Sequence, residues 1–140
     1  MKTLPLLTES VRTQVRCEMV DVTNRLRHAV QAEGIKDGMA IVYIPHTTAA
    51  VTINENADPD VQHDLIRKLD ELIPKRESYY QHTEGNSDSH VKTSLVGGSV
   101  IVLIENGQLV LGRWQGVFFC EFDGPRQRQM HFKLIDFTSR

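Results

Sequence analysis

The chain has 140 residues, which suits a single domain over residues 1–140 that needs no disulfide or metal to fold. Its 16 basic and 18 acidic residues give a net charge of −2, which argues against a nucleic-acid-binding protein. No apolar run approaches the roughly 18 residues of a membrane span, and the N-terminal run is too short for a signal peptide. We therefore expect a cytoplasmic protein without a membrane partner.

The first part of the chain predicts strands on both sides of a helix. Residues 6–19 have the composition of a strand. Residues 21–34 change to a helical period, and Gly34 suits the position after a last helical turn. Residues 39–55 are rich in β-branched side chains and predict two strands with a bend near residues 45–48.

The clearest predicted helix covers Asp58–Ile73. Asp58 is suited to cap its N-terminus, and Pro59 follows at the first helical position, where proline loses no hydrogen bond. Apolar side chains then recur at steps of four residues and form a stripe that we expect to be buried: Val61, Leu65, Leu69 and Ile73.

The second part predicts a polar loop, a short helix and four strands. The segment HTEGNSDSH (82–90) is expected to bend at Gly85 and Asn86 with positive φ, and Ser87 or Asp88 is expected to cap a helix that ends at Val96.

Asn106-Gly107 predicts a tight hairpin between two strands, and GVFFCEF, DGPR and QMHFKLIDF predict a second hairpin. Strands at both ends with helices between them indicate an antiparallel α+β fold with two or three helices.

Three histidines in polar segments form a candidate metal site. His46 follows a strand, and His82 and His90 delimit the polar loop. We expect these imidazoles to converge in one cleft and to hold a divalent metal, zinc rather than magnesium because magnesium prefers oxygen ligands. Glu84 and Asp88 would orient an imidazole or transfer a proton. The alternatives are an anion in that cleft or an ordinary hydrogen-bonded loop.

The segment DGPRQR is a candidate phosphate site. Arg126 and Arg128 follow Asp123, and two arginines can clamp a phosphate through paired hydrogen bonds. A plain β-turn at Gly124-Pro125 explains the same residues and is compatible with phosphate binding.

Three long motifs carry a family resemblance: HTTAAVTINENADPDV, HTEGNSDSHVKTSLVG and GQLVLGRWQGVFFCEFDGPRQR. Over nearly the whole chain they resemble the YjbQ family, also called the secondary thiamine-phosphate synthase family. The resemblance implies a compact α+β fold with a layered antiparallel β-sheet or sandwich. It also implies a homotrimer with polar clefts near its subunit contacts. It places the family's polar residues at His46, Thr47, Thr48, Asn54, Glu55, His82, Glu84, Asn86, His90, Trp114, Gln115, Glu121, Asp123 and Arg126. Arg113 departs from the pattern, because a small residue is expected before Trp114.

The activity that the resemblance implies joins a pyrimidine pyrophosphate to a thiazole phosphate, as a main or a side activity. The principal enzymes of this reaction are TIM barrels of about 250 residues, so a site in this chain must be unrelated to theirs. We expect catalytic roles for Glu55, Glu84 and Asp88, and binding of a phosphorylated small molecule by Thr47, Thr48, Asn54, Asn86, Gln115, Arg126 and Arg128. The alternatives are a non-enzymatic trimer that binds a metal or an anionic metabolite, and a metal-assisted phosphate hydrolase.

Overall fold

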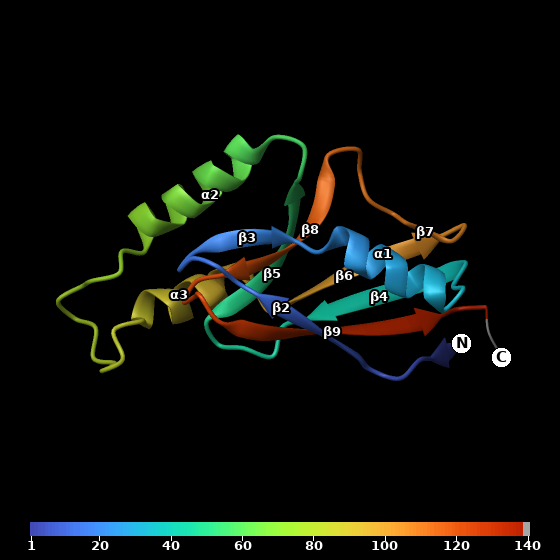
Figure 1. Ribbon diagram of the computed structural model, residues 1–140, viewed down its shortest axis with the longest axis horizontal. Coiled ribbons are helices and arrows are strands. Elements are labelled where there is room, and N and C mark those ends of the chain that lie inside the picture. The colour runs from blue at the N-terminus through green and yellow to red at the C-terminus, as the bar shows by residue number, and fades with distance from the viewer. Residues whose placement is uncertain (139–140) are drawn as a thin grey trace.

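The computed structural model describes residues 1–138 and has two antiparallel sheets and three helices (Figure 1), which confirms the α+β prediction. None of the helices in this part of the chain is long and apolar enough to cross a bilayer. The elements in chain order are β1 (Lys2–Thr3), β2 (Leu7–Arg12), β3 (Glu18–Asp21), α1 (Thr23–Ala32), β4 (Asp37–Tyr43), β5 (Ala49–Glu55), α2 (Pro59–Leu72), α3 (Ser87–Val96), β6 (Ser99–Glu105), β7 (Gln108–Leu109), β8 (Gln115–Glu121) and β9 (Gln127–Asp136).

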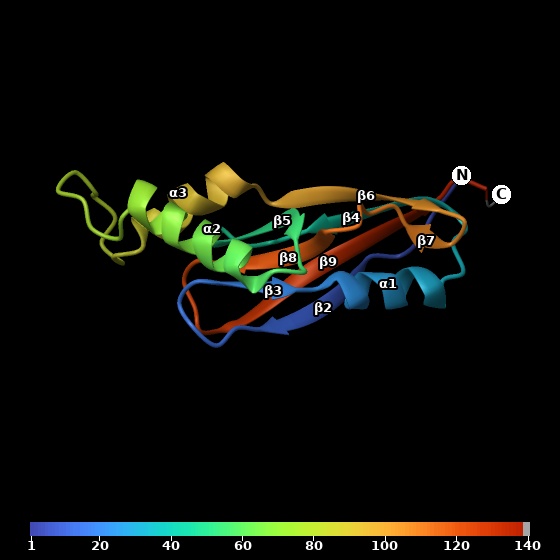
Figure 2. The same cartoon turned by 90° about the horizontal axis from the view of Figure 1, so that it is seen from above.

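Six strands form the larger sheet, called sheet A here, in the order β1-β9-β4-β6-β7 with β2 also paired to β9. The smaller sheet, sheet B, has the order β3-β8-β5. The main apolar core includes side chains of both sheets and of α1, such as Val42, Phe119 and Leu26. A second cluster on sheet B packs against α2 and α3. In Figure 2 these two helices lie together at one end of the molecule, away from α1.

Strand β8 is buried on both of its faces, which explains its continuous apolar run. Val117 and Phe119 belong to the main core, whereas Phe118 and Cys120 belong to the cluster under α2 and α3. A strand covered on both faces does not show the alternation of a half-exposed strand. This position in the middle of sheet B brings the end of β8, at Glu121, next to the start of β5.

The hairpin at Asn106-Gly107 is confirmed, with φ of 52° and 76° at the two turn residues. The second predicted hairpin is wrong, because β8 belongs to sheet B while β9 crosses to sheet A. The single strand predicted over residues 6–19 is also wrong. It divides into β2 and β3, which belong to different sheets, because the chain bends at residues 13–17 to pass from one sheet to the other.

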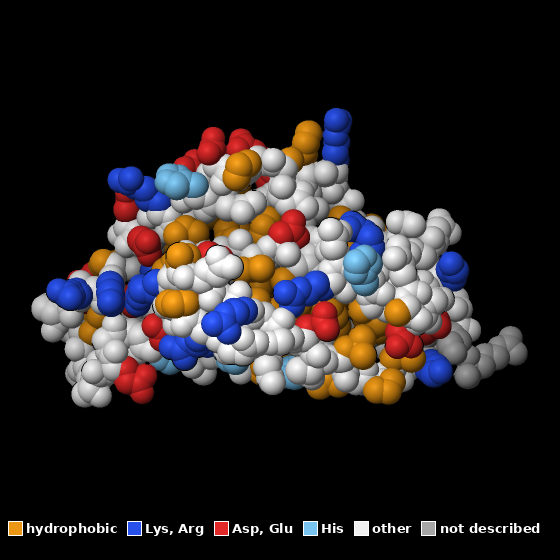
Figure 3. Space-filling view, viewed as in Figure 1, with side chains coloured by type: hydrophobic (Ala, Val, Ile, Leu, Met, Phe, Trp, Pro, Cys, Tyr) orange, Lys and Arg blue, Asp and Glu red, His pale blue; other side chains and the backbone are white. Residues whose placement is uncertain are grey.

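Helix α2 begins as the sequence predicts but is less buried than expected. The Asp58 side chain accepts a hydrogen bond from the Asp60 amide at 2.9 Å, and Pro59 is the first helical residue. No residue of α2 is fully buried, and the four residues of the predicted stripe are only half-buried, so the prediction of a buried stripe is wrong. Sheet B is only three strands wide, and a cavity separates part of α2 from it. Figure 3 shows apolar side chains in the hollow below this helix.

Candidate functional site

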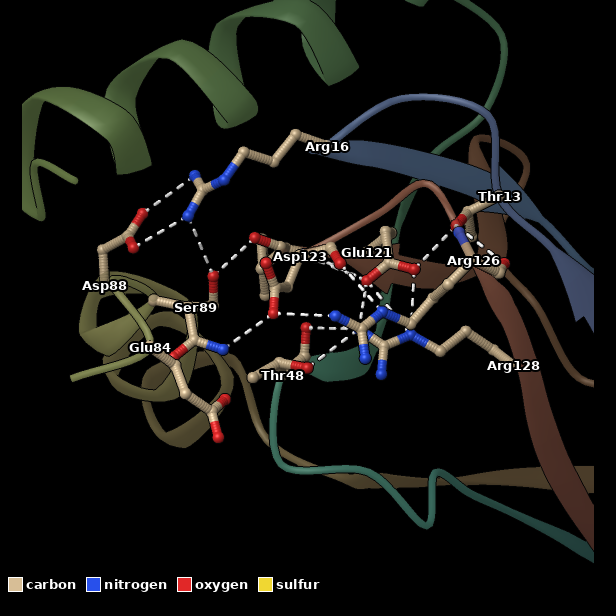
Figure 4. Close-up of polar contacts among 12 residues, drawn as sticks. Thr13, Arg16, Thr48, Glu84, Asp88, Ser89, Glu121, Asp123, Arg126 and Arg128 are labelled. Carbon is tan, nitrogen blue, oxygen red and sulfur yellow. Dashed lines mark hydrogen bonds and ion pairs between the residues drawn. The ribbon is translucent and has the colours of Figure 1, made fainter. Parts of the chain in front are cut away.

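A buried ion pair lies where the ends of β5 and β8 meet β9 (Figure 4). Arg128 donates from Nε to the two carboxylate oxygens of Glu121 at 2.9 and 3.1 Å, and the Thr13 hydroxyl donates to the same carboxylate at 2.7 Å. Arg128 Nη2 also donates to the Thr48 hydroxyl at 2.9 Å and contacts Glu121. Burial raises the pKa of Glu121, but the hydrogen bonds from Arg128 and Thr13 outweigh it, so the net pKa is lowered and the carboxylate is ionised.

An open pocket of about 550 Å³ lies beside this ion pair, and no carboxylate of residues 1–138 belongs to its lining. Its lining residues are Tyr43, Ile44, Pro45, His46, Thr47, Thr48, Arg126 and Arg128. Arg126 donates to the Asp123 carbonyl at 2.9 Å and to its carboxylate at 3.0 Å. The remaining terminal nitrogen, Nη1, makes no hydrogen bond within residues 1–138, and the Arg126 side chain is 48% exposed. The pocket thus has a free donor on a cationic side chain.

His46 contributes a neutral imidazole to this pocket. Its Nε2 accepts a hydrogen bond at 3.0 Å from the Gln129 amide, in the part of β9 that does not pair with β4. Burial lowers the pKa of His46, and the charge of Arg128 lowers it further. With Nε2 acting as an acceptor, the proton of the neutral ring must be on Nδ1. His46 therefore offers Nδ1–H as a hydrogen-bond donor. The hydrogen bond from the Gln129 amide occupies the lone pair of Nε2 that a metal would need.

The other two candidate histidines form a pair between the polar loop, which contains His82, and helix α3, which contains His90. The rings of His82 and His90 meet edge to face with centroids 5.4 Å apart, and His82 Nε2 is 3.6 Å from the Glu84 carboxylate. No three His, Cys, Asp or Glu side chains in the described part of the chain are placed to hold a metal. The expected convergence of His46 with this pair is therefore wrong for a single chain, and metal binding stays a prediction.

Asn86 connects this loop to the pocket. Its amide nitrogen donates at 2.8 Å to the same Asp123 carboxylate oxygen that accepts from Arg126. Asn86 is the N-cap residue of α3, so the expected cap at Ser87 or Asp88 is wrong, although no side-chain hydrogen bond closes this cap. Gly85 has the expected positive φ of 73°, whereas Asn86 has a φ of −127°.

Asp88 is fully buried and holds the start of α3 in place. Two nitrogens of Arg16 donate to its oxygens at 3.0 and 3.1 Å, and Lys92 Nζ donates at 3.2 Å. Burial raises the pKa of Asp88, but the hydrogen bonds from Arg16 and Lys92 outweigh it and lower the net pKa. A carboxylate fixed in this way is a poor proton-transfer group near neutral pH, so this placement argues against the expected catalytic role.

Four further candidate residues lie at the opposite end of sheet B. The register pairs Ala49 with Glu121 at one end and Glu55 with Gln115 at the other. Six residues of strand separate these pairs, which is roughly 20 Å. The group at the far end is Asn54, Glu55, Trp114 and Gln115.

The contacts at this far end are local. The Glu55 carboxylate accepts from the Asp58 amide at 3.2 Å, and the Gln115 side chain accepts from the Gly112 amide at 2.8 Å. Trp114 is 53% exposed, and the guanidinium carbon of Arg113 lies 4.7 Å from its ring centroid. The predicted site residues thus fall into two separate groups within one chain.

Residues 8–136 match the family model described as UPF0047 protein YjbQ-like. The chain belongs to this family. It is 49% identical over 130 residues to UPF0047 protein YugU of Bacillus subtilis, covering 93% of this chain and 98% of YugU. It is 51% identical over 130 residues to UPF0047 protein MJ1081 of Methanocaldococcus jannaschii, covering 93% and 94% of the two chains.

Solved structures agree with this assignment. A YjbQ/UPF0047 family protein from Clostridium acetobutylicum superposes with a TM-score of 0.90 at 50% identity, over 92% of this chain and 99% of that one. A YbjQ-like protein of unknown function from Sulfolobus solfataricus gives a TM-score of 0.91 at 28% identity, over 96% and 98% of the two chains. The YjbQ resemblance of the sequence is confirmed.

Three polar residues of this YjbQ-like site had no signal in the sequence: Thr13, Arg16 and Lys92. Thr13 and Arg16 lie in the bend between β2 and β3, which composition predicts as part of a strand. Asp88 and Lys92 are spaced i,i+4 on α3, a pattern that is typical of an exposed helix surface, yet both are fully buried. Only the packing of α3 against its neighbours reveals their role.

Proposed function

We propose that this YjbQ-like protein binds the phosphate group of a phosphorylated small molecule in the pocket beside His46. The supporting observation is the pocket lining, which combines two arginines, two threonines and a neutral histidine and has no carboxylate. Arginine nitrogens suit phosphate oxygens because charge-assisted hydrogen bonds are stronger than neutral ones. A Nδ1–H donor on His46 and the Thr47 hydroxyl would complete the set of donors.

Arg126 and Arg128 have different parts in this proposal. Glu121 already neutralises Arg128, which is only 3% exposed and keeps one terminal nitrogen without a protein partner among residues 1–138. Arg126 is half-exposed and bonded to the partly buried Asp123. We therefore assign most of the attraction for phosphate to Arg126, and assign Arg128 the task of holding Thr48 at the pocket wall.

Our leading hypothesis is that the protein is an enzyme similar to secondary thiamine-phosphate synthases. In this hypothesis Glu84 or the His82–His90 pair transfers a proton. The contact from Asn86 through Asp123 to Arg126 supports it, since Asn86 joins the polar loop to α3 and these two segments carry the proposed proton-transfer groups. The second reading is a protein that binds a phosphorylated metabolite without turnover. The burial of Asp88 favours this reading, because it leaves fewer carboxylates near the pocket for proton transfer.

We also propose a homotrimer. The outer face of sheet A exposes neighbouring apolar side chains, with Tyr43 53%, Ile101 57% and Leu103 54% exposed, and a second copy would cover them. Contact between copies would also allow the far end of sheet B in one subunit, around Gln115, to approach the His46 pocket of another. Light scattering at micromolar concentration tests this assembly, and the mass of a single chain would refute it.

Calorimetric titration with inorganic phosphate and with pyrophosphate tests the binding site. We expect Arg126→Gln to weaken binding by roughly 10- to 100-fold, the effect of losing one charge-assisted hydrogen bond. Arg67→Gln is the matched control, because Arg67 is exposed on α2 and lies outside the pocket. Equal affinities of the two variants, or no binding by the parent protein, would contradict the proposal.

An assay for pyrophosphate release from a mixture of a pyrimidine pyrophosphate and a thiazole phosphate distinguishes the enzymatic hypothesis from the non-enzymatic one. If Glu84 transfers a proton, Glu84→Gln abolishes turnover while pyrophosphate binding survives. Phosphate binding by the parent protein without any turnover would favour the non-enzymatic reading.

A further inference from the structure

A second cavity, separate from the His46 pocket, lies between α2, α3 and the outer face of sheet B. Its volume is about 160 Å³, and its lining is mostly apolar. The lining residues are Met19, Thr52, Asn54, Leu65, Ile66, Leu69, Leu95, Val96, Cys120 and Phe122. None of them lines the His46 pocket, so the two spaces are independent sites.

We propose that this cavity binds a small apolar ring of about six heavy atoms that has one hydrogen-bond-accepting edge. The volume carries the first part of the proposal, because an engineered apolar cavity of about 150 Å³ in another protein stays dry and binds benzene. A cavity of ≈ 160 Å³ therefore has room for one six-membered ring.

The chemistry of the walls excludes a charged ligand. Among the described residues, no acidic or basic side chain lines the cavity. Burial raises the pKa of the Cys120 thiol to about 12, so it is uncharged near neutral pH and acts as a small apolar wall. An ion in this space would lose most of its hydration without gaining a partner of opposite charge.

Two polar groups at one edge of the cavity define the orientation of the ring. Asn54 uses its carbonyl oxygen to accept from the Glu55 amide at 2.7 Å, and its amide nitrogen makes no hydrogen bond in the described part of the chain. The Thr52 hydroxyl, next to it on the same face of β5, is likewise free of side-chain partners there. Both groups can donate, which is why the ligand edge is assigned as an acceptor.

Helix α2 gives the ligand a way in. Its cavity-lining residues Leu65, Ile66 and Leu69 are half-buried, and none of its residues is fully buried. Among the described residues, its one side-chain ion pair to another element joins the half-exposed Asp70 to Lys92 of α3. A helix that is held this lightly can move outward without exposing the main core, which belongs to the other face of sheet B.

Fluorine NMR titration with fluorobenzene and 3-fluoropyridine tests the proposal on the full chain. We expect saturable binding of both probes, with 3-fluoropyridine bound roughly 2- to 10-fold more tightly because it adds one neutral hydrogen bond. Asn54→Ala is expected to remove that preference and to leave fluorobenzene binding in place. Failure of both probes to saturate, or equal affinity of the parent protein for both, would overturn the proposal.

Leu69→Trp tests where the probes bind, because the larger side chain fills the cavity. This variant should weaken the binding of both probes at least 10-fold. Leu72→Trp is the matched control, because it makes the same exchange on the same helix at a residue that is 62% exposed and outside the cavity. Equal effects of the two variants would overturn the assignment. Nuclear Overhauser contacts between the probes and the Ile66 and Val96 methyl groups of the parent protein test the location without any substitution, and their absence would also overturn it.

Discussion

Replacing Arg128 by methionine is expected to destabilise the fold strongly. The change removes the cation of the buried pair while keeping a side chain of similar length, and Glu121 remains fully buried. Its carboxylate then keeps only the Thr13 hydroxyl and the backbone amides of Phe122 and Asp123 as donors. Leaving a buried charge without its partner costs about 3–5 kcal/mol of unfolding free energy.

The pH dependence provides an independent check of the mechanism. The pKa of Glu121 is lowered in the folded protein, so its contribution to stability is present above the unfolded pKa and is lost as pH falls through the folded pKa. In the variant, burial without Arg128 raises that pKa instead. Protonation then removes the unpaired charge, so the difference in stability between variant and parent must shrink as the pH falls from 7 to 5.

Urea unfolding at pH 7 and pH 5 measures both effects, at one protein concentration because assembly would change the apparent stability. The control is the double variant Glu121→Leu with Arg128→Met, which replaces both charges by apolar groups and should recover most of the loss. A loss below about 1 kcal/mol for the single variant, or a double variant no more stable than the single one, would refute this account of the pair.

Two smaller predictions concern the turns and the thiols. Gly107 has a φ of 76°, so Gly107→Ala should lower the unfolding free energy by about 1–2 kcal/mol. Gly98→Ala is the control, because Gly98 has no positive φ and its replacement should change the unfolding free energy little. Thermal melts of the two variants measure the difference. Burial raises the pKa of the fully buried Cys120, so this thiol should react slowly with a disulfide reagent at pH 7.5 and rapidly in guanidinium. Cys17 is only partly buried and should react first, and fast labelling of Cys120 in the folded protein would contradict its burial.

The features that the sequence predicted correctly depend on neighbours in the chain. The Asn106-Gly107 turn needs two residues that accept positive φ, and both are adjacent. The start of α2 needs Asp58 next to Pro59, and the side chain caps an amide two residues away. The α+β class follows in the same way, since local composition distinguishes strands from helices.

The features that the sequence predicted wrongly depend on contacts between distant segments. Strand β8 lies between β3 and β5, and nothing near residues 115–121 encodes that choice of partners. The expected meeting of His46 with His82 is wrong within a single chain for the same reason, because it required two loops separated by a whole helix to adopt one relative position. Arg16 and Asp88, 72 residues apart, form a charge pair that no local pattern could indicate.

The ion pairs Glu121–Arg128 and Asp123–Arg126 differ in exposure. This difference supports a structural role for the first pair and a ligand-binding role for the second. Glu121 and Arg128 are 0% and 3% exposed, and satisfy each other, so their position is fixed before any ligand arrives. Arg126 is half-exposed, and its partner Asp123 has a second donor in Asn86, so Arg126 can turn towards a phosphate without leaving a buried carboxylate unpaired. The buried pair therefore sets the geometry of the pocket wall, and the exposed arginine is the side chain that is free to respond to a ligand.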